Sequence, residues 1–162
     1  MKKYYLAYGS NLSVTQMAHR CPNAVYVGTA EIPGYRLLFK GSKTGYYLTI
    51  EKKKGSAVPV LVWQISEWDE RNLDAYEGYP AFYYKKEMKV ELESFISSMP
   101  KHPIEALVYI MHEERHTGIP SGHYYETCME GYQRFGFDKK ILEQALKDSS
   151  EKEMLKEADY YV

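Results

Sequence analysis

Short apolar runs, separated by strings of turn-forming residues, fill the first two-thirds of the chain and predict strands. The predicted strands cover residues 3–8, 25–30, 35–40, 46–50 and 58–65. Between them lie Pro33-Gly34, Gly41-Ser42 and the string from Lys52 to Ser56. These spacings are typical of hairpins. The lysine run at 52–54 is interpreted as a solvated loop tip.

A strand further along shows the clearest alternation of apolar and polar positions. One face carries Tyr84, Met88, Val90 and Leu92. The other face carries Lys85, Glu87, Lys89 and Glu91. Side chains alternate between the two faces of a strand, so this pattern predicts a strand with one face against the core. After a loop containing Met99-Pro100 and Pro103, residues 104–111 form the last predicted strand.

Helical patterns lie between and after these strands. Ser13 is a candidate cap for a short helix over residues 13–19. A clearer helix begins at Ser66, where Asp69 three residues later resembles a capping box, and ends at Gly78-Tyr79-Pro80.

Two further helices follow in the last third of the chain. Ser121 caps the first of them, which has Tyr125, Met129 and Tyr132 on one stripe and ends near Gly136. Asp138 opens the second, with these inward-facing residues: Ile141, Leu142, Ala145 and Leu146.

The order of elements, rich in strands first and in helices last, predicts an α+β domain built around a mixed sheet or small barrel. We assign this domain to residues 1–148. Residues 149–162 form a charged tail that we expect to be helical. The tail is either docked on the domain or a contact between two copies of the chain, which leaves a homodimer open.

Composition restricts the function classes. The chain has 162 residues, and its 44% hydrophobic and 27% charged content indicates one soluble globular domain. Lys+Arg 21 against Asp+Glu 22 gives a net charge of -1, which offers no electrostatic footprint for nucleic acid or an anionic membrane. The 17 tyrosines suit either a polar ligand pocket or a half-exposed sheet.

Cysteine content and hydropathy add two expectations. With only two cysteines, Cys21 and Cys128, neither a disulfide framework nor a cysteine-rich metal cluster is expected. The apolar stretch from Tyr4 to Tyr8 is too short for a signal peptide, and no later run reaches the ~18 residues that span a bilayer. The expected location is therefore the cytoplasm.

Two strings could carry chemistry. Tyr8-Gly9-Ser10-Asn11-Leu12 follows the first strand. Glycine there permits close approach of a ligand, and the turn's amides could hold an anion, although a plain tight turn has the same composition. Glu77 lies at the C-terminal end of a predicted helix, where the macrodipole and partial burial both raise a carboxyl pKa. A general base needs such tuning, but a solvated glutamate would fit the same position.

Other motifs are weaker. His112-Glu113-Glu114-Arg115-His116 matches the zinc-protease pattern, which requires both histidines on one face of a long helix. The string follows a predicted strand and breaks at 117–120, so we interpret it as a charged loop and expect no metal. Tyr124 after Pro120-Ser121 is either a ligand contact or a core ring.

Taken together and in order, these strings resemble the gamma-glutamyl cyclotransferase family over residues 4–147. The resemblance rests on Tyr8 to Leu12, Gly34 to Leu37 before Phe39, Thr49-Ile50 with the Gly55 turn, Val62-Trp63, Leu73-Asp74 with Glu77 to Pro80, Tyr109, and Pro120-Ser121 with Tyr124.

The resemblance implies a small mixed β-barrel flanked by helices, with a pocket at one mouth. The family's acid/base glutamate corresponds to Glu77. The segment that holds the glutamyl group corresponds to Tyr8, Gly9, Ser10 and Asn11, with Tyr5, Leu6 and Ala7 as the strand that leads in. Ring residues near the substrate correspond to Tyr109, Tyr124 and one of Tyr83 or Tyr84. Tyr84 is preferred because it shares the apolar face of its strand.

The expected reaction closes a gamma-glutamyl group into 5-oxoproline and releases an amine, with no metal, cofactor or covalent intermediate. Leu48 and Val60 stand where relatives usually carry smaller residues, so the leaving amine stays open. A free amino acid, glutathione, a lysine side-chain amine and an antibiotic amine all remain candidates. The rival function is a non-catalytic binder of a small carboxylate in the same pocket.

Overall fold

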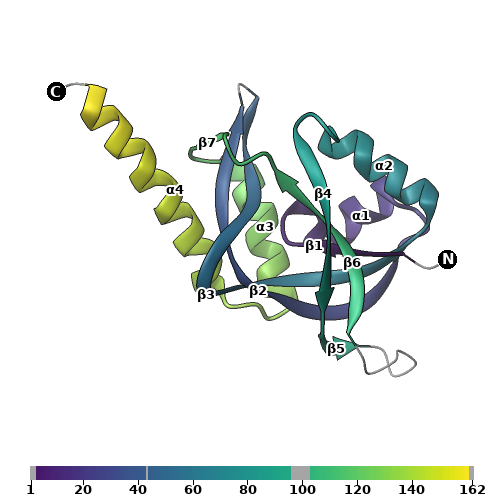
Figure 1. Ribbon diagram of the computed structural model, residues 1–162. Coiled ribbons are helices and arrows are strands. Elements are labelled where there is room, and N and C mark those ends of the chain that lie inside the picture. Colours follow the sequence, from purple (N-terminus) through teal and green to yellow (C-terminus); the bar gives the residue numbers. More distant parts are fainter. Residues whose placement is uncertain (1–2, 43, 96–102, 161–162) are drawn as a thin grey trace.

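A mixed sheet that curls into a half-barrel forms the centre of the computed structural model, which describes residues 3–42, 44–95 and 103–160 (Figure 1). The strand order is β4-β6-β1-β3-β2-β5, and β7 pairs with β2. β1 runs parallel to β6 and antiparallel to β3. The strands are β1 (Lys3–Ala7), β2 (Val25–Ser42), β3 (Gly45–Ile65), β4 (Tyr83–Val90), β5 (Leu92–Phe95), β6 (Ile104–Met111) and β7 (His116–Thr117).

Four α-helices flank this sheet in the described residues, which confirms the α+β class predicted from the sequence. Figure 1 shows α1 and α2 together at the end of the sheet near the N-terminus, and α4 projecting away at the opposite end. The helices are the 3-10 helix η1 (Ser10–Leu12), α1 (Val14–Arg20), α2 (Glu67–Glu77), α3 (Gly122–Arg134) and α4 (Lys139–Tyr160). None of them, within the described ranges, has the length and apolar character needed to cross a bilayer.

The predicted helix caps are confirmed. The Ser13 hydroxyl accepts a hydrogen bond from the Gln16 amide at 3.3 Å, and Ser121 caps α3 in the same way. Ser66 and Asp69 form a reciprocal capping box, with each side chain accepting from the other residue's amide at 3.1 Å. Each cap satisfies an amide that the first turn of a helix leaves without an intrahelical partner.

The long hairpin differs from the prediction. Four short strands were expected between residues 25 and 65, but β2 and β3 are two long strands that pair along most of their length. The predicted turns at Pro33-Gly34 and Lys52 to Ser56 are absorbed as a bulge, where the register shifts from Pro33–Ala57 to Tyr35–Lys52. Gly34 and Gly55 take φ of 75° and 86°, which lets the extra residues be accommodated without ending the ladder.

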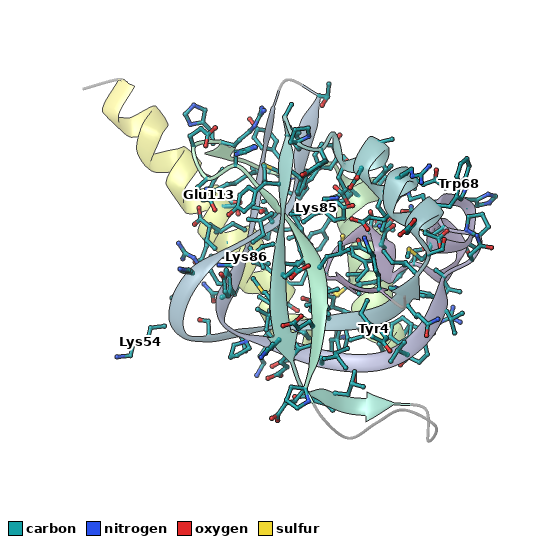
Figure 2. All side chains as sticks on the ribbon, turned by 45° about the vertical axis from the view of Figure 1, so that its right-hand side comes forward. Tyr4, Lys54, Trp68, Lys85, Lys86 and Glu113 are labelled. Carbon is teal, nitrogen blue, oxygen red and sulfur yellow. The ribbon has the colours of Figure 1, made fainter. Side chains whose placement is uncertain are left out.

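The lysine run lies on the outside of this bulge. Residues 52–54 are exposed, and Figure 2 shows Lys54 projecting into solvent. The interpretation as a solvated segment is therefore confirmed, although the segment is part of a strand and not a loop tip.

Gly131 controls how closely α3 approaches η1. It is buried, and an added Cβ would lie 2.5 Å from the Leu12 Cβ, well inside van der Waals contact. Leu12 is fully buried and is the last residue of η1. The absence of a side chain at position 131 therefore holds the turn after β1 in its place.

We expect Gly131→Ala to destabilise the fold. Overpacking costs ~1–3 kcal/mol, whereas the better helix propensity of alanine contributes at most about 1 kcal/mol. The net loss in free energy of unfolding should be about 1 kcal/mol, measured by urea denaturation. Gly122→Ala on the same helix is the control, because nothing lies within 4 Å of its added Cβ. Equal stability of the two variants would contradict the close approach of Leu12.

Candidate active site

A cavity of about 350 Å³ lies where β1 leads into η1 and α2 ends. It gathers side chains from β1, η1, the tip of the β2–β3 hairpin, α2, β4, β6 and α3. The lining residues are Tyr5, Leu6, Tyr8, Gly9, Ser10, Asn11, Thr44, Tyr47, Leu48, Ala75, Tyr76, Glu77, Gly78, Phe82, Tyr83, Tyr109 and Tyr124.

The turn after β1 forms one wall of the cavity. A Cβ on Gly9 would lie 3.2 Å from the Tyr124 hydroxyl and 3.6 Å from the Leu48 Cβ, so glycine permits the close approach of these residues. Ser10 and Asn11 begin a 3-10 helix, whose first amides have no intrahelical acceptor. Among the described residues these two amides donate to no other group, so they can serve an anion in the cavity.

Arg20, the last residue of α1, holds this turn in place. Its guanidinium donates to the Ser10 hydroxyl at 3.2 Å and to the Asn11 side-chain oxygen. The same group lies 3.4 Å from the centre of the Tyr76 ring on α2. Arg20 thus connects α1, η1 and α2 beside the cavity. The sequence carried no signal for this role, because a basic residue in the last turn of a helix is usual.

Glu77 is the last residue of α2, and Gly78 ends the helix with φ of 65°. The Glu77 side chain is half-buried and lines the cavity. Burial raises the pKa of this carboxyl to about 7, and the positive charge of Arg20 opposes the rise. Within the described residues, the carboxyl takes part in no hydrogen bond or close ion pair. It is therefore available to a molecule in the cavity.

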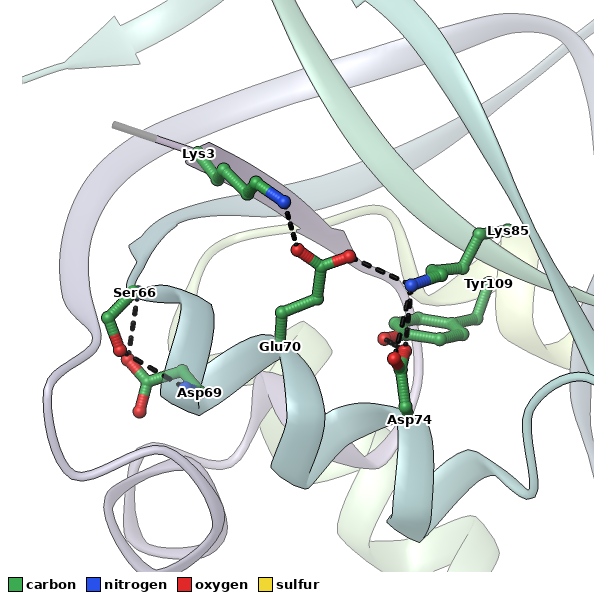
Figure 3. A network of polar contacts seen from close by, with 7 residues as sticks. All are labelled: Lys3, Ser66, Asp69, Glu70, Asp74, Lys85 and Tyr109. Carbon is green, nitrogen blue, oxygen red and sulfur yellow. Dashed lines mark hydrogen bonds and ion pairs between the residues drawn. The ribbon is translucent and has the colours of Figure 1, made fainter. Parts of the chain in front are cut away.

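A network of charged side chains fixes α2 to the sheet (Figure 3). The Lys85 ammonium on β4 bridges Glu70 at 2.8 Å and Asp74 at 3.1 Å. Lys3 on β1 binds the other oxygen of Glu70 at 2.5 Å. The Tyr109 hydroxyl on β6 donates to Asp74 at 2.5 Å. Three strands thereby hold the helix that ends in Glu77.

Hydrogen bonds between tyrosine hydroxyls and backbone groups fix a second part of the cavity lining. Tyr83 donates to the Leu48 carbonyl at 2.9 Å, while the Leu48 amide donates to the Tyr124 hydroxyl at 3.0 Å. Tyr8 donates to the Tyr109 carbonyl at 2.6 Å. Burial raises the pKa of Tyr8, Tyr83 and Tyr124 well above the ordinary value. These three hydroxyls stay neutral near pH 7, whereas the Glu77 carboxyl can exchange a proton there.

The cavity contains most residues selected from the sequence: Glu77, Tyr5, Leu6, Tyr8, Gly9, Ser10, Asn11, Tyr109 and Tyr124. Ala7 is buried in β1 but does not reach the lining. Leu48 does line the cavity, whereas Val60 is buried in the core away from it.

The choice of Tyr84 is wrong, because Tyr83 lines the cavity and Tyr84 does not. Tyr84 lies on the other face of β4, where its hydroxyl donates to Glu113. The error arose because the alternation of apolar and polar residues in this strand predicted that Lys85 lies on a solvated face. Lys85 instead pairs with α2, so this face of the strand packs toward that helix, and Tyr83 on the same face lines the cavity.

Further lining residues were not selected from the sequence: Thr44, Tyr47, Ala75, Tyr76, Gly78 and Phe82. They come from the hairpin tip and from the end of α2 and the segment after it. Only folding brings these segments together, and no local pattern distinguishes their rings from core aromatics.

The string His112 to His116 does not have the helical geometry that a zinc-protease motif requires. Neither His112 nor His116 lies in a helix, since His112 follows β6 and His116 begins β7. A His112 ring nitrogen lies 2.7 Å from the Pro80 carbonyl. The described residues contain no cluster of three or more histidine, cysteine or acidic side chains able to hold a metal. β7 itself was not predicted, because a pair of residues has no detectable pattern.

Comparison with known proteins identifies the fold and the family. The structure is similar to a solved gamma-glutamyl cyclotransferase, with a TM-score of 0.76 and 25% identity over 90% of this chain and 86% of the other. A human protein, titled uncharacterized protein loc79017, gives a TM-score of 0.75 and 26% identity over 89% and 86% of the two chains.

Sequence comparisons agree with the structural ones. The chain is 32% identical over 114 residues to a gamma-glutamylcyclotransferase of Bos taurus, which covers 66% of this chain and 58% of that protein. The family model described as gamma-glutamyl cyclotransferase, AIG2-like, matches residues 5–126, which include the β1 turn, Glu77 and the start of α3. The chain therefore belongs to the gamma-glutamyl cyclotransferase, AIG2-like family.

Proposed function

We propose that this protein is a cyclotransferase that converts a gamma-glutamyl amide into 5-oxoproline and a free amine, with Glu77 as general acid and base. One observation carries the proposal. A half-buried carboxyl with a pKa of about 7 and no hydrogen-bond partner among the described residues faces the same cavity as the amides of Ser10 and Asn11. The chain's family membership supports the same reaction.

The reaction needs little from the protein beyond position and proton transfer. A gamma-glutamyl amide contains its own nucleophile, the α-amine, which closes a five-membered ring on the γ-carbonyl. Binding the substrate in a bent form makes this attack intramolecular, which can contribute ~7–11 kcal/mol to lowering the barrier. The amides of Ser10 and Asn11 would bind either the α-carboxylate or the oxyanion that develops on the γ-carbonyl.

A single carboxyl can carry out all the proton transfers of the proposed reaction. The Glu77 carboxylate takes a proton from the α-ammonium, and the freed nitrogen forms its bond to the γ-carbon. Glu77 then gives that proton to the departing nitrogen as the old C–N bond breaks. A second proton from the ring nitrogen follows the same route, so the amine leaves as an ammonium ion and Glu77 returns to carboxylate. A pKa near 7 suits a group that must accept and donate in one cycle.

We expect Glu77→Gln to retain the fold and lower 5-oxoproline formation by about 10²–10⁴-fold, the usual contribution of acid–base catalysis. Turnover of a gamma-glutamyl panel is followed by chromatography of 5-oxoproline, and circular dichroism checks the fold. Glu67→Gln, an exposed glutamate at the start of the same helix, is the matched control. A Glu77→Gln variant with the parent rate would exclude Glu77 as the base. Binding without turnover by the parent protein would favour the rival function of a carboxylate binder.

The same substitution should stabilise the protein above neutral pH. The Glu77 pKa is raised from 4.5 to about 7, so the folded state binds more protons than the unfolded state and loses stability as pH rises between these values. That shift corresponds to at most about 3 kcal/mol, which access to solvent reduces. Urea denaturation should therefore show similar stabilities for parent and variant near pH 4.5 and a more stable variant at pH 8. A difference in stability between parent and variant that does not change with pH would contradict the raised pKa of Glu77.

Arg20→Gln should move the pH dependence of turnover. Because the Arg20 charge lowers the Glu77 pKa, its removal should raise that pKa and shift the rising limb of the kcat/KM profile to higher pH. Arg20→Lys keeps the charge but loses the planar group that contacts Ser10 and Asn11. This control should keep the parent midpoint while losing activity. An unchanged midpoint in Arg20→Gln would show that the guanidinium does not act on Glu77.

A further inference from the structure

A second cavity of about 350 Å³ lies where the start of α4 packs against the β2–β3 hairpin. It shares no lining residue with the cavity that contains Glu77. Its residues come from the bulged part of the hairpin, within 31–37 and 53–57, and from 140–148 of α4. Figure 1 shows the first turns of α4 beside these two strands. The volume is within the range of small-molecule sites, and the proposed cyclotransferase reaction uses none of these residues.

Three cations line this second cavity: Arg36, Lys53 and Lys140. Within the described residues, the ammonium groups of Lys53 and Lys140 form no ion pair or hydrogen bond. The Arg36 guanidinium is partly buried, and its Nε atom has no hydrogen-bond partner. The carboxylate oxygens of Asp148 and Glu51 lie 3.7 Å and 4.0 Å from its terminal nitrogens, which is beyond hydrogen-bond distance. The three cations therefore keep donors that an anion in the cavity can use.

Two carboxylates also line the cavity, and their charges oppose an anion. Asp148 is already engaged, because it pairs with Arg36 and accepts a hydrogen bond from the Gln144 side-chain amide at 2.8 Å. Glu31 is exposed and, in the described part of the chain, forms no ion pair. Three cations against two carboxylates leave an excess of positive charge in the lining, whereas the whole chain carries a net charge of -1. The cavity therefore favours an anionic ligand.

Part of the lining is apolar. Leu37 on β2 and Ala145 on α4 are buried, and Ile141 on α4 is partly buried against the core. Small-molecule sites commonly combine such an apolar surface with a few polar groups that orient the ligand. A molecule with an anionic group and a small apolar body fits both parts of this lining.

We propose that this second cavity binds a phosphate monoester, with the phosphate held by Arg36, Lys53 and Lys140 and the organic group against the apolar lining. A phosphate monoester carries a charge of about −1.5 to −2 near neutral pH and has three strong acceptor oxygens. A carboxylate carries a single negative charge and has two oxygens. The larger charge and the third oxygen suit a site with three cations, of which arginine can bind two oxygens at once.

Isothermal titration calorimetry of the whole protein with phenyl phosphate tests the proposal. We expect binding that weakens as NaCl is added, because salt screens exposed charges. Benzoate, which has the same ring but a carboxylate in place of the phosphate, should bind more weakly. Absence of phenyl phosphate binding, or equal affinity for benzoate, would overturn the proposal. Because the measurement is of binding, such a failure leaves the proposed cyclotransferase function unaffected.

A double charge variant assigns the binding to this cavity. Lys53→Gln with Lys140→Gln should raise the Kd for phenyl phosphate at least about tenfold. Lys54→Gln with Lys139→Gln is the matched control, because these exposed neighbours lie outside the lining and Figure 2 shows Lys54 projecting into solvent. The control should keep the parent Kd. An unchanged Kd in the first variant, or an equal rise in both, would overturn the assignment.

Glu31→Gln should act in the opposite direction. It removes a negative charge from the lining and should lower the Kd for phenyl phosphate several-fold. Glu143→Gln makes the same chemical change at an exposed residue of α4 outside the cavity, and it should keep the parent Kd. A Kd in Glu31→Gln that equals or exceeds the parent value would show that the phosphate does not lie in this cavity.

Discussion

The pairing of Lys85 with Glu70 and Asp74 is the interaction on which the site depends. Glu70 and Asp74 lie four residues apart on one face of α2, so one ammonium on β4 can bind both. Lys3 and Tyr109 add contacts from β1 and β6. Helix α2 is therefore held by three strands, and its last residue, Glu77, lines the cavity.

This placement has opposite consequences for stability and chemistry. Burial disfavours the charged form of Glu77, which weakens the folded state above the ordinary pKa of a glutamate. The same desolvation brings the carboxyl pKa near neutrality, where it can accept and return a proton. The buried tyrosines around it remain neutral, so they shape the cavity and orient Leu48 without competing for protons.

Different residues of the cavity have separate tasks in the proposed reaction. The amides after Gly9 and the tyrosine hydroxyls suit the constant part of the proposed substrate, which is the glutamyl group. Three further rings of the lining, Tyr47, Tyr76 and Phe82, come from the hairpin, from α2 and from the segment before β4. In the proposed reaction, variation among these rings would change the leaving amine without altering Glu77, since one fold can support different specificities.

Sequence patterns by themselves determined the helix caps and the α+β class, and the order of the motifs carried the resemblance that selected the candidate site residues. Caps such as Ser66 with Asp69 are local, and the strings around Gly9 and Glu77 are distinctive in their order. Tertiary structure alone decided which face of β4 meets the cavity, because the ion pairs of Lys85 with α2 override the apparent polar face and bring in Tyr83. It also decided the contacts of Arg20 and which aromatic rings line the cavity. These depend on contacts between residues far apart in the chain, and such contacts leave no periodic signal in the sequence.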